Sequence, residues 1–162
     1  MKYVIDKNTK KHISGHFDEK NSLGSCFRVD HFPNVDILLA TLEKYQPVDQ
    51  IEGSDNRISD VYLLSDFEFI GWYGIGLKIN FPGSSIQFQS RNGFSTEFIE
   101  TAHLPKTKYV TVVYKEQNGN NNIITLFPGP YAPAFPHIKM KAEEFNYATQ
   151  YWSDHILLKK AH

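Results

Sequence analysis

The chain has 162 residues, of which 41% are hydrophobic, 22% charged and 14% aromatic. This length fits a single folded domain over residues 1–162, and the apolar and aromatic content excludes a disordered chain. The single cysteine excludes an internal disulfide and a thiolate metal cluster. A net charge of −1 argues against a general nucleic-acid coat protein. No apolar run is long enough to cross a membrane, and no secretory leader is visible, so neither is expected.

The charge is unevenly distributed along the chain. Residues 1–70 contain 12 acidic and 8 basic side chains, whereas residues 71–162 contain 6 acidic and 9 basic ones. The second half therefore offers a positive surface to an anion, unless the difference is an ordinary fluctuation of composition.

The first sixty residues predict few regular elements. Residues 1–22 are polar and show no periodicity, so we expect an arm or loop there, with a short strand at residues 3–5. Asn34 is placed to cap a helix whose apolar side chains recur at helical spacing. Residues 23–29 are predicted to be extended, and the polar stretch 49–60 to be a loop.

The rest of the chain is predicted to be mainly strands. Residues 61–64 form a short apolar run, and the glycines within residues 67–81 indicate bulges or close backbone contacts. Two hairpins are expected, residues 86–90 with 94–99 around Asn92-Gly93, and residues 109–114 with 123–127 around an Asn/Gly-rich tip. Residues 142–160 follow helical spacing, with Trp152 and Ile156 expected on the buried stripe. The predicted fold is α+β, with one antiparallel sheet covered by one helix from the N-terminal half and one C-terminal helix.

Motifs for common cofactors and nucleophiles are missing. The glycine-rich residues 71–76 lack a Gly-Lys-Ser/Thr ending, and the chain contains no Gly-x-Ser-x-Gly or His-Glu-x-x-His. His12 and His16 have the spacing of a helical zinc pair, but the Gly between them disfavours a helix. Cys26 has Arg28 and His31 nearby, yet a lone cysteine is more often a small buried hydrophobe than a nucleophile. We therefore expect neither a cofactor nor a metal.

The remaining polar residue types fit a reaction of RNA that needs no metal. In that reaction a ribose 2′-hydroxyl attacks its own phosphate, which requires a general base, a general acid and cations on the phosphate oxygens. Histidine serves as acid and base near neutral pH, and Lys, Arg, Thr and Tyr hold phosphate. Residues 100–136 concentrate these types.

Residues 109–129 also resemble a known protein family. A strand of alternating Val and Thr, a short turn, and Ile124-Thr125-Leu126-Phe127-Pro128-Gly129 are similar to the last hairpin of the barnase, colicin and RelE-like bacterial toxin ribonucleases. The opening Lys11-His12-Ile13-Ser14-Gly15-His16 is similar to the start of some polymorphic toxin domains of contact-dependent inhibition systems. The near-neutral charge departs from the basic character of many such nucleases.

The resemblance implies a site and a function. His103, Thr125, Lys108 and His16 would be the catalytic set, converging on one anion-sized pocket, and Lys106 and Arg91 would bind substrate. The protein would then be a metal-independent endoribonuclease toxin that acts on RNA, transfer RNA included, in a bacterial cytoplasm, delivered as part of a larger secreted protein and held inactive by a cognate immunity protein.

Two other classes of function stay open. The near-neutral charge and acidic first half favour a non-enzymatic binding module, such as the immunity or antitoxin partner of a toxin. A ligand-binding or accessory domain is the third hypothesis. For each predicted site residue a purely structural role is the competing interpretation, since threonine favours strands and lysine protects strand edges.

Overall fold

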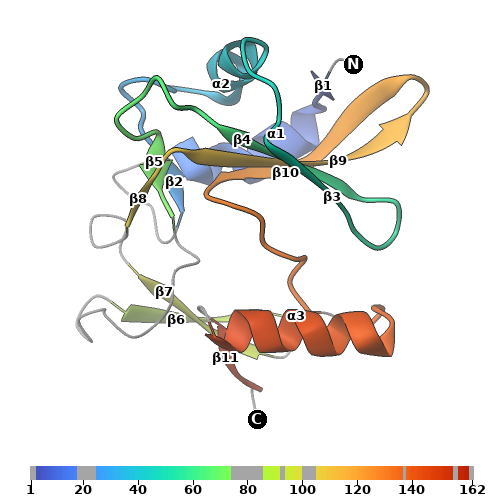
Figure 1. The fold of residues 1–162 in the computed structure, drawn as a ribbon. Coiled ribbons are helices and arrows are strands. Elements are labelled where there is room, and N and C mark those ends of the chain that lie inside the picture. The colour runs from blue at the N-terminus through green and yellow to red at the C-terminus, as the bar shows by residue number, and fades with distance from the viewer. Residues whose placement is uncertain are drawn as a thin grey trace.

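The α+β fold is built around a five-stranded sheet (Figure 1). The computed structural model describes residues 3–17, 25–73, 86–91, 94–99, 105–136, 138–154 and 157–160. The sheet has the order β1-β10-β9-β4-β3, and all its neighbours pair antiparallel except β1 with β10. Its strands are, in that order, Tyr3–Val4, Asn120–Pro128, Tyr109–Gln117, Ile58–Leu63 and Asp49–Glu52.

The β9–β10 hairpin confirms the strongest sequence prediction. Its tip is formed by Asn118 and Gly119, whose φ angles of 53° and 77° lie in the left-handed region that Asn and Gly tolerate. The register shifts between Ile123 and Thr125, so one residue of β10 bulges out of the ladder. Beyond the bulge Thr125 lies opposite Val113.

The prediction of a loop at residues 49–60 is wrong. Asp49–Glu52 and the start of β4 form a hairpin whose turn uses Asp55 and Asn56 at φ 54° and 57°. An apolar pattern could not reveal β3, because this strand lies at the sheet edge with mostly exposed polar side chains. Lys115 on β9 pairs with Asp55 at 2.8 Å, which fixes the turn beside the central strand.

The N-terminal segment is folded rather than a loop over the part that the structure describes. Helix α1 spans Lys7–Ile13, and the 3₁₀ helix η1 spans Ser14–Phe17. Asp6 caps α1 by accepting a hydrogen bond from the Thr9 amide at 2.7 Å. Ile13 is the one residue of α1 that is buried, so the sequence shows no apolar periodicity to reveal the helix.

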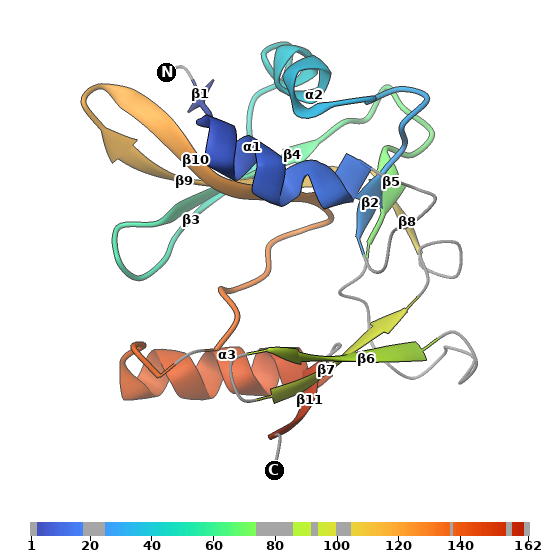
Figure 2. The ribbon, with the colours of Figure 1, turned by 180° about the vertical axis from the view of Figure 1, so that it is seen from behind.

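Helix α2 (Val35–Leu42) matches its prediction. The Asn34 side chain accepts a hydrogen bond from the Ile37 amide at 3.0 Å, and Val35, Leu38 and Leu42 are buried. These side chains and Ile13 pack with apolar residues on one face of the large sheet, which is therefore the face that α1 and α2 cover (Figure 2). The sheet residues of this core are Tyr62, Val110, Val112, Tyr114, Ile123 and Leu126.

The prediction of one sheet is wrong, because two smaller three-stranded sheets accompany the large one. The first has the order β2-β5-β8, formed by Cys26–Phe27, Gly71–Trp72 and Lys106–Thr107. The second has the order β11-β7-β6, formed by Leu157–Lys160, Phe94–Ile99 and Ile86–Arg91. Pairing of β6 with β7 confirms the predicted second hairpin.

Gly71 explains how the β2-β5-β8 sheet meets its neighbours. A Cβ at this position would lie 2.5 Å from the Cys26 carbonyl oxygen and 3.0 Å from the Pro128 Cβ at the end of β10. The distance to the carbonyl oxygen is too short for a real Cβ and the distance to Pro128 is tighter than most Cβ contacts, so the close approach requires glycine. The sequence prediction of a close backbone contact is confirmed at this glycine.

The C-terminal helix is shorter than predicted. Helix α3 ends at Asp154, and residues 157–160 form β11 beside β7, because strand pairing overrides the helical spacing of this apolar stretch. Trp152 is half-buried against Phe135, at 5.5 Å between ring centroids, and its indole donates to the Pro133 carbonyl at 3.2 Å. Ile156 lies outside the described residues.

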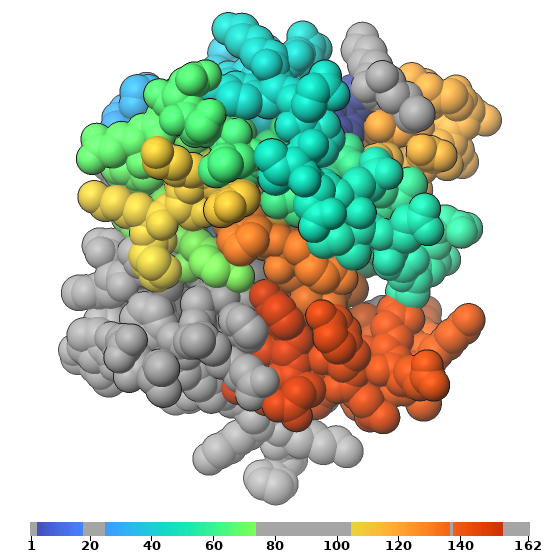
Figure 3. Space-filling model, in the orientation of Figure 1, coloured from blue at the N-terminus to red at the C-terminus, as the bar shows by residue number. Residues whose placement is uncertain are grey.

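Helix α3 lies away from α1 and α2, on the other side of the large sheet (Figures 1 and 2). In the space-filling view α3 abuts the segment that follows β10, below the β3–β4 hairpin (Figure 3). A hydrogen bond from Ser54 in that hairpin to Glu144 of α3 joins the two. Within the described ranges no helix combines the length and apolarity that crossing a bilayer requires.

Candidate functional site

Cationic and aromatic side chains gather around the β2-β5-β8 sheet. We call this group the basic–aromatic cluster and define it as Arg28, Asp30, His31, Phe69, Trp72 and Lys106. Arg28 directly follows β2, Phe69 comes just before β5, and Lys106 lies on β8. Trp72 pairs with Cys26 on one side and with Lys106 on the other, so the small sheet brings three distant chain segments to one place.

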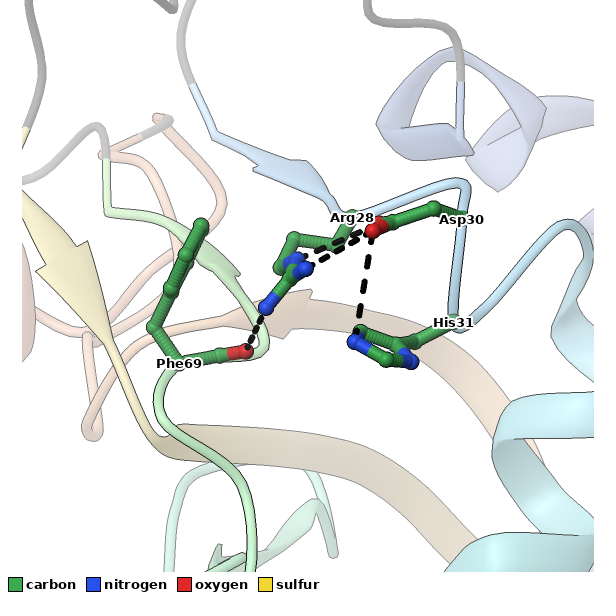
Figure 4. Close-up of polar contacts among 4 residues, drawn as sticks. All are labelled: Arg28, Asp30, His31 and Phe69. Carbon is green, nitrogen blue, oxygen red and sulfur yellow. Dashed lines mark hydrogen bonds and ion pairs between the residues drawn. The ribbon is translucent and has the colours of Figure 1, made fainter.

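Arg28 is the most constrained member of the cluster (Figure 4). Its Nε and Nη2 donate to the two carboxylate oxygens of Asp30 at 3.1 and 2.7 Å, and Nη1 donates to the Phe69 carbonyl at 3.3 Å. The guanidinium carbon lies 4.2 Å from the centroid of the Phe69 ring. Hydrogen bonding to this guanidinium holds the pKa of Asp30 below its usual range. The cation is thus fixed in orientation, with 18% of its side chain exposed.

A second cation approaches the same ring. The Lys106 ammonium lies 4.5 Å from the Phe69 centroid, and Trp72 meets Phe69 edge-on at 5.4 Å. Cations near an aromatic ring are attracted by its quadrupole, by about 0.5–1 kcal/mol at exposed sites. Phe69 therefore keeps two positive charges close together at the surface.

His31 adds an imidazole to the cluster. It belongs to a tight turn in which the amides of His31 and Phe32 both donate to the Arg28 carbonyl, at 3.2 and 2.8 Å. Its ring packs edge-on against Phe67 at 5.7 Å, while Nε2 lies 3.9 Å from Asp30 Oδ2. With 43% of its side chain exposed, the imidazole is both positioned and open to solvent.

The cluster has the chemistry for binding a phosphodiester next to a base. Arginine and lysine neutralise phosphate charge, and guanidinium and aromatic planes stack on nucleobases of any sequence. An exposed imidazole beside them supplies proton transfer.

The structure does not assemble the predicted catalytic set at one point. Thr125 lies opposite Val113, and Lys108 precedes Val113 by five positions along the chain, which is about 17 Å of extended strand. The expectation that the hairpin brings Lys108 and Thr125 within reach of one anion is therefore wrong. Lys108 is exposed, and its carbonyl accepts a hydrogen bond from the Leu64 amide.

His16 also lies apart from Thr125. Its Nδ1 donates to the Ser25 carbonyl at 2.8 Å, and burial lowers its pKa. It follows α1, on the side of the large sheet where Ile13 packs, whereas Thr125 shares the opposite face with Val113. The structure gives His16 a role in joining η1 to the start of β2.

The other predicted residues have mixed outcomes. Lys106 belongs to the cluster described above. His103 lies outside the described residues, and Arg91 lies on β6, where the structure describes only the strand.

The Pro128-Gly129 motif that underlies the family resemblance has a structural explanation. Gly129 has φ 124°, and a Cβ there would overlap the ring of Tyr73. The amide of Gly129 donates to the Tyr109 carbonyl at 2.7 Å, and its carbonyl accepts from the buried Thr111 hydroxyl at 2.9 Å. Glycine is therefore required here by packing and backbone conformation alone.

A second polar cluster is buried and closed. Asp60, 4% exposed, accepts hydrogen bonds from the hydroxyls of Tyr3 and Tyr114 and from the Gln50 amide, the latter two at 3.2 and 2.8 Å. The Tyr62 hydroxyl then donates to Tyr3 at 2.6 Å. Burial raises the pKa of Tyr3 and Tyr62, so both hydroxyls stay protonated. With its oxygens satisfied, Asp60 is a structural anchor for β1 rather than a binding site.

Sequence reasoning missed the main residues of the basic–aromatic cluster. Arg28 and His31 are conspicuous only as the basic neighbours of Cys26, which is fully buried. The available signal was the aromatic-rich stretch of residues 67–72, of which Phe69 and Trp72 belong to the cluster while Phe67 packs against the core.

Neither a metal site nor a similar protein helps to define the function of this chain. Among the described residues, no group of three or more His, Cys, Asp or Glu side chains is placed to hold a metal ion. Comparisons with family models, curated proteins and solved structures gave no match to this chain.

Proposed function

We propose that this protein binds single-stranded RNA at the basic–aromatic cluster and cleaves it without a metal. The observation that carries the proposal is the placement of two cations, Arg28 and Lys106, within 4.2 and 4.5 Å of the Phe69 ring at the protein surface. Phosphates of the strand would lie against the two cations, and a base would stack on the guanidinium or on one of the half-buried rings of Phe69 and Trp72.

RNA is favoured over DNA because RNA carries its own nucleophile. Attack by the 2′-hydroxyl on the adjacent phosphate requires cations and proton transfer but no bound ion. The cluster offers both kinds of group, whereas a two-metal nuclease would need several carboxylate ligands. We therefore retain the hypothesis of RNA cleavage without a metal, but we place the site at the β2-β5-β8 sheet and not on the sheet face that contains Thr125.

The test combines binding and cleavage. Purified full-length protein is mixed with a fluorescent single-stranded RNA in EDTA, and the products are separated on a denaturing gel. We expect cleavage in EDTA and no cleavage of the DNA strand of the same sequence. RNA that stays intact and unbound would refute the proposal.

A binding module without catalysis is the second candidate function, and one observation favours it. Arg28 is already neutralised in part by the bidentate contact with Asp30, so the cluster is less cationic than its residue count suggests. A protein of this class, such as an immunity or antitoxin partner, would bind its target and leave RNA uncut. RNA that is bound but not cut, or growth that continues when the protein is induced in bacteria, would support this alternative.

A further inference from the structure

The imidazole of His31 is only partly used in packing, because one edge contact with Phe67 at 5.7 Å leaves 43% of the side chain exposed. Buried apolar residues hold the surrounding turn, since Phe32 is 1% exposed and belongs to the core. Two backbone hydrogen bonds to the Arg28 carbonyl close the turn without using the imidazole. A polar or apolar side chain of similar size would therefore preserve the fold at residue 31.

We propose that His31 is the general base of the RNA cleavage reaction, an inference that rests on the proposed function. The imidazole and the Arg28 guanidinium share the same carboxylate, because Asp30 Oδ2 lies 2.7 Å from Nη2 and 3.9 Å from Nε2 of His31 (Figure 4). A phosphate held by the cation therefore lies near the imidazole, and the ribose attached to it brings its 2′-hydroxyl within reach.

The reaction balances without any added reagent. One ring nitrogen of His31 takes the proton of the 2′-hydroxyl as its oxygen forms a bond to phosphorus. The bond from phosphorus to the 5′-oxygen breaks, and that oxygen takes a proton from water or from the imidazolium. The products are a 2′,3′-cyclic phosphate and a free 5′-hydroxyl.

Asp30 is the positioning residue in this scheme. When His31 takes up the proton, the resulting imidazolium forms an ion pair with the carboxylate of Asp30. The contact between Asp30 and Arg28 is kept. Among the residues that the structure describes, the ion pairs at this turn include one other charged side chain, the Arg28 guanidinium, which the same carboxylate balances.

The test compares two histidine variants. His31→Ala should lower the rate of RNA cleavage about 10²–10⁴-fold, whereas His12→Ala, an exposed histidine of α1 outside the cluster, should leave it unchanged. Both variants should keep a cooperative urea transition, which shows that they are folded. Free imidazole added to the buffer should restore part of the activity of His31→Ala and none of a variant that is merely misfolded.

The outcomes separate this inference from the proposed function. A 2′-deoxy substitution at the cleaved nucleotide should leave binding intact and stop the reaction, and the wild-type product should carry a cyclic phosphate. If wild-type RNA cleavage is absent, the proposed function fails. If cleavage persists in His31→Ala, or if imidazole gives no rescue of a folded variant, the proposed function stands and the role of His31 is refuted.

Discussion

Lys106 permits a sharp test of RNA binding because its charge can be removed without disturbing the fold. Its side chain is exposed, and its backbone is held by pairing with Trp72. Lys106→Gln keeps half of the aliphatic stem and loses the ammonium 4.5 Å from the Phe69 ring. We therefore expect a loss of affinity for RNA, with a loss of stability of no more than about 1 kcal/mol from the cation–ring contact.

The size of the expected loss of affinity for RNA follows from counterion release. Each phosphate neutralised on a single strand contributes about −0.7 to the slope of log K against log salt concentration. If Arg28 and Lys106 each neutralise one phosphate, the wild-type slope contains about −1.4 from the cluster, and Lys106→Gln should make the slope shallower by about 0.7. The loss of affinity should therefore be largest at low salt.

Fluorescence anisotropy with a 2′-deoxy-substituted RNA, which is not cleaved, measures this slope over several salt concentrations. Lys139→Gln is the matched control, since it removes the same charge from an exposed position that precedes α3. Equal slopes for wild type and Lys106→Gln, or equal changes in the two variants, would refute the assignment of Lys106 to the binding surface.

Three further predictions concern stability and are read by urea denaturation. Gly71→Ala should destabilise the fold by about 1–3 kcal/mol, because its Cβ would meet the Cys26 carbonyl; a neutral result would contradict the close approach. Tyr3→Phe should cost about 1–3 kcal/mol by leaving buried Asp60 without one donor, and a change below about 0.5 kcal/mol would mean that β1 is not anchored there. Stability should fall as the pH drops below about 6.5, because the pKa of His16 is lowered in the folded state and the unfolded chain therefore binds a proton that the folded chain does not. His16→Gln should weaken this pH dependence of stability, and a variant with the same pH profile as wild type would contradict the reasoning.

The sequence predicted those elements that contain their own signals. The β9–β10 hairpin has alternation on both strands and a tip of Asn and Gly, and α2 has both a capping asparagine and an apolar stripe. By contrast, α1 buries only Ile13 and β3 buries no residue fully, so neither leaves an apolar pattern in the sequence. The end of α3 was misjudged because apolar residues at helical spacing also suit a strand, and pairing with β7 decides between them.

The site was harder to predict than the fold for a physical reason. The motif Ile124 to Gly129 suggested that chemistry would lie on the last hairpin, but Gly129 is explained by the Tyr73 ring and Thr125 by its place in the strand. Proximity in sequence also misled, since Lys106 and Lys108 are neighbours in the chain, yet the structure shows only Lys106 at the Phe69 ring within the residues it describes. The partners of Lys106 come from β2 and β5, and no local pattern encodes that pairing.

The β2-β5-β8 sheet has a consequence for how the protein becomes active during folding. Its three strands have two residues each and come from separate parts of the chain, so no strand is stable alone and each pairing closes a long loop. Contacts of this kind form late, after the local hairpins and helices. Arg28, Phe69 and Lys106 therefore meet only in a chain that is almost completely folded, and a fragment lacking any one of these strands would not form the binding surface.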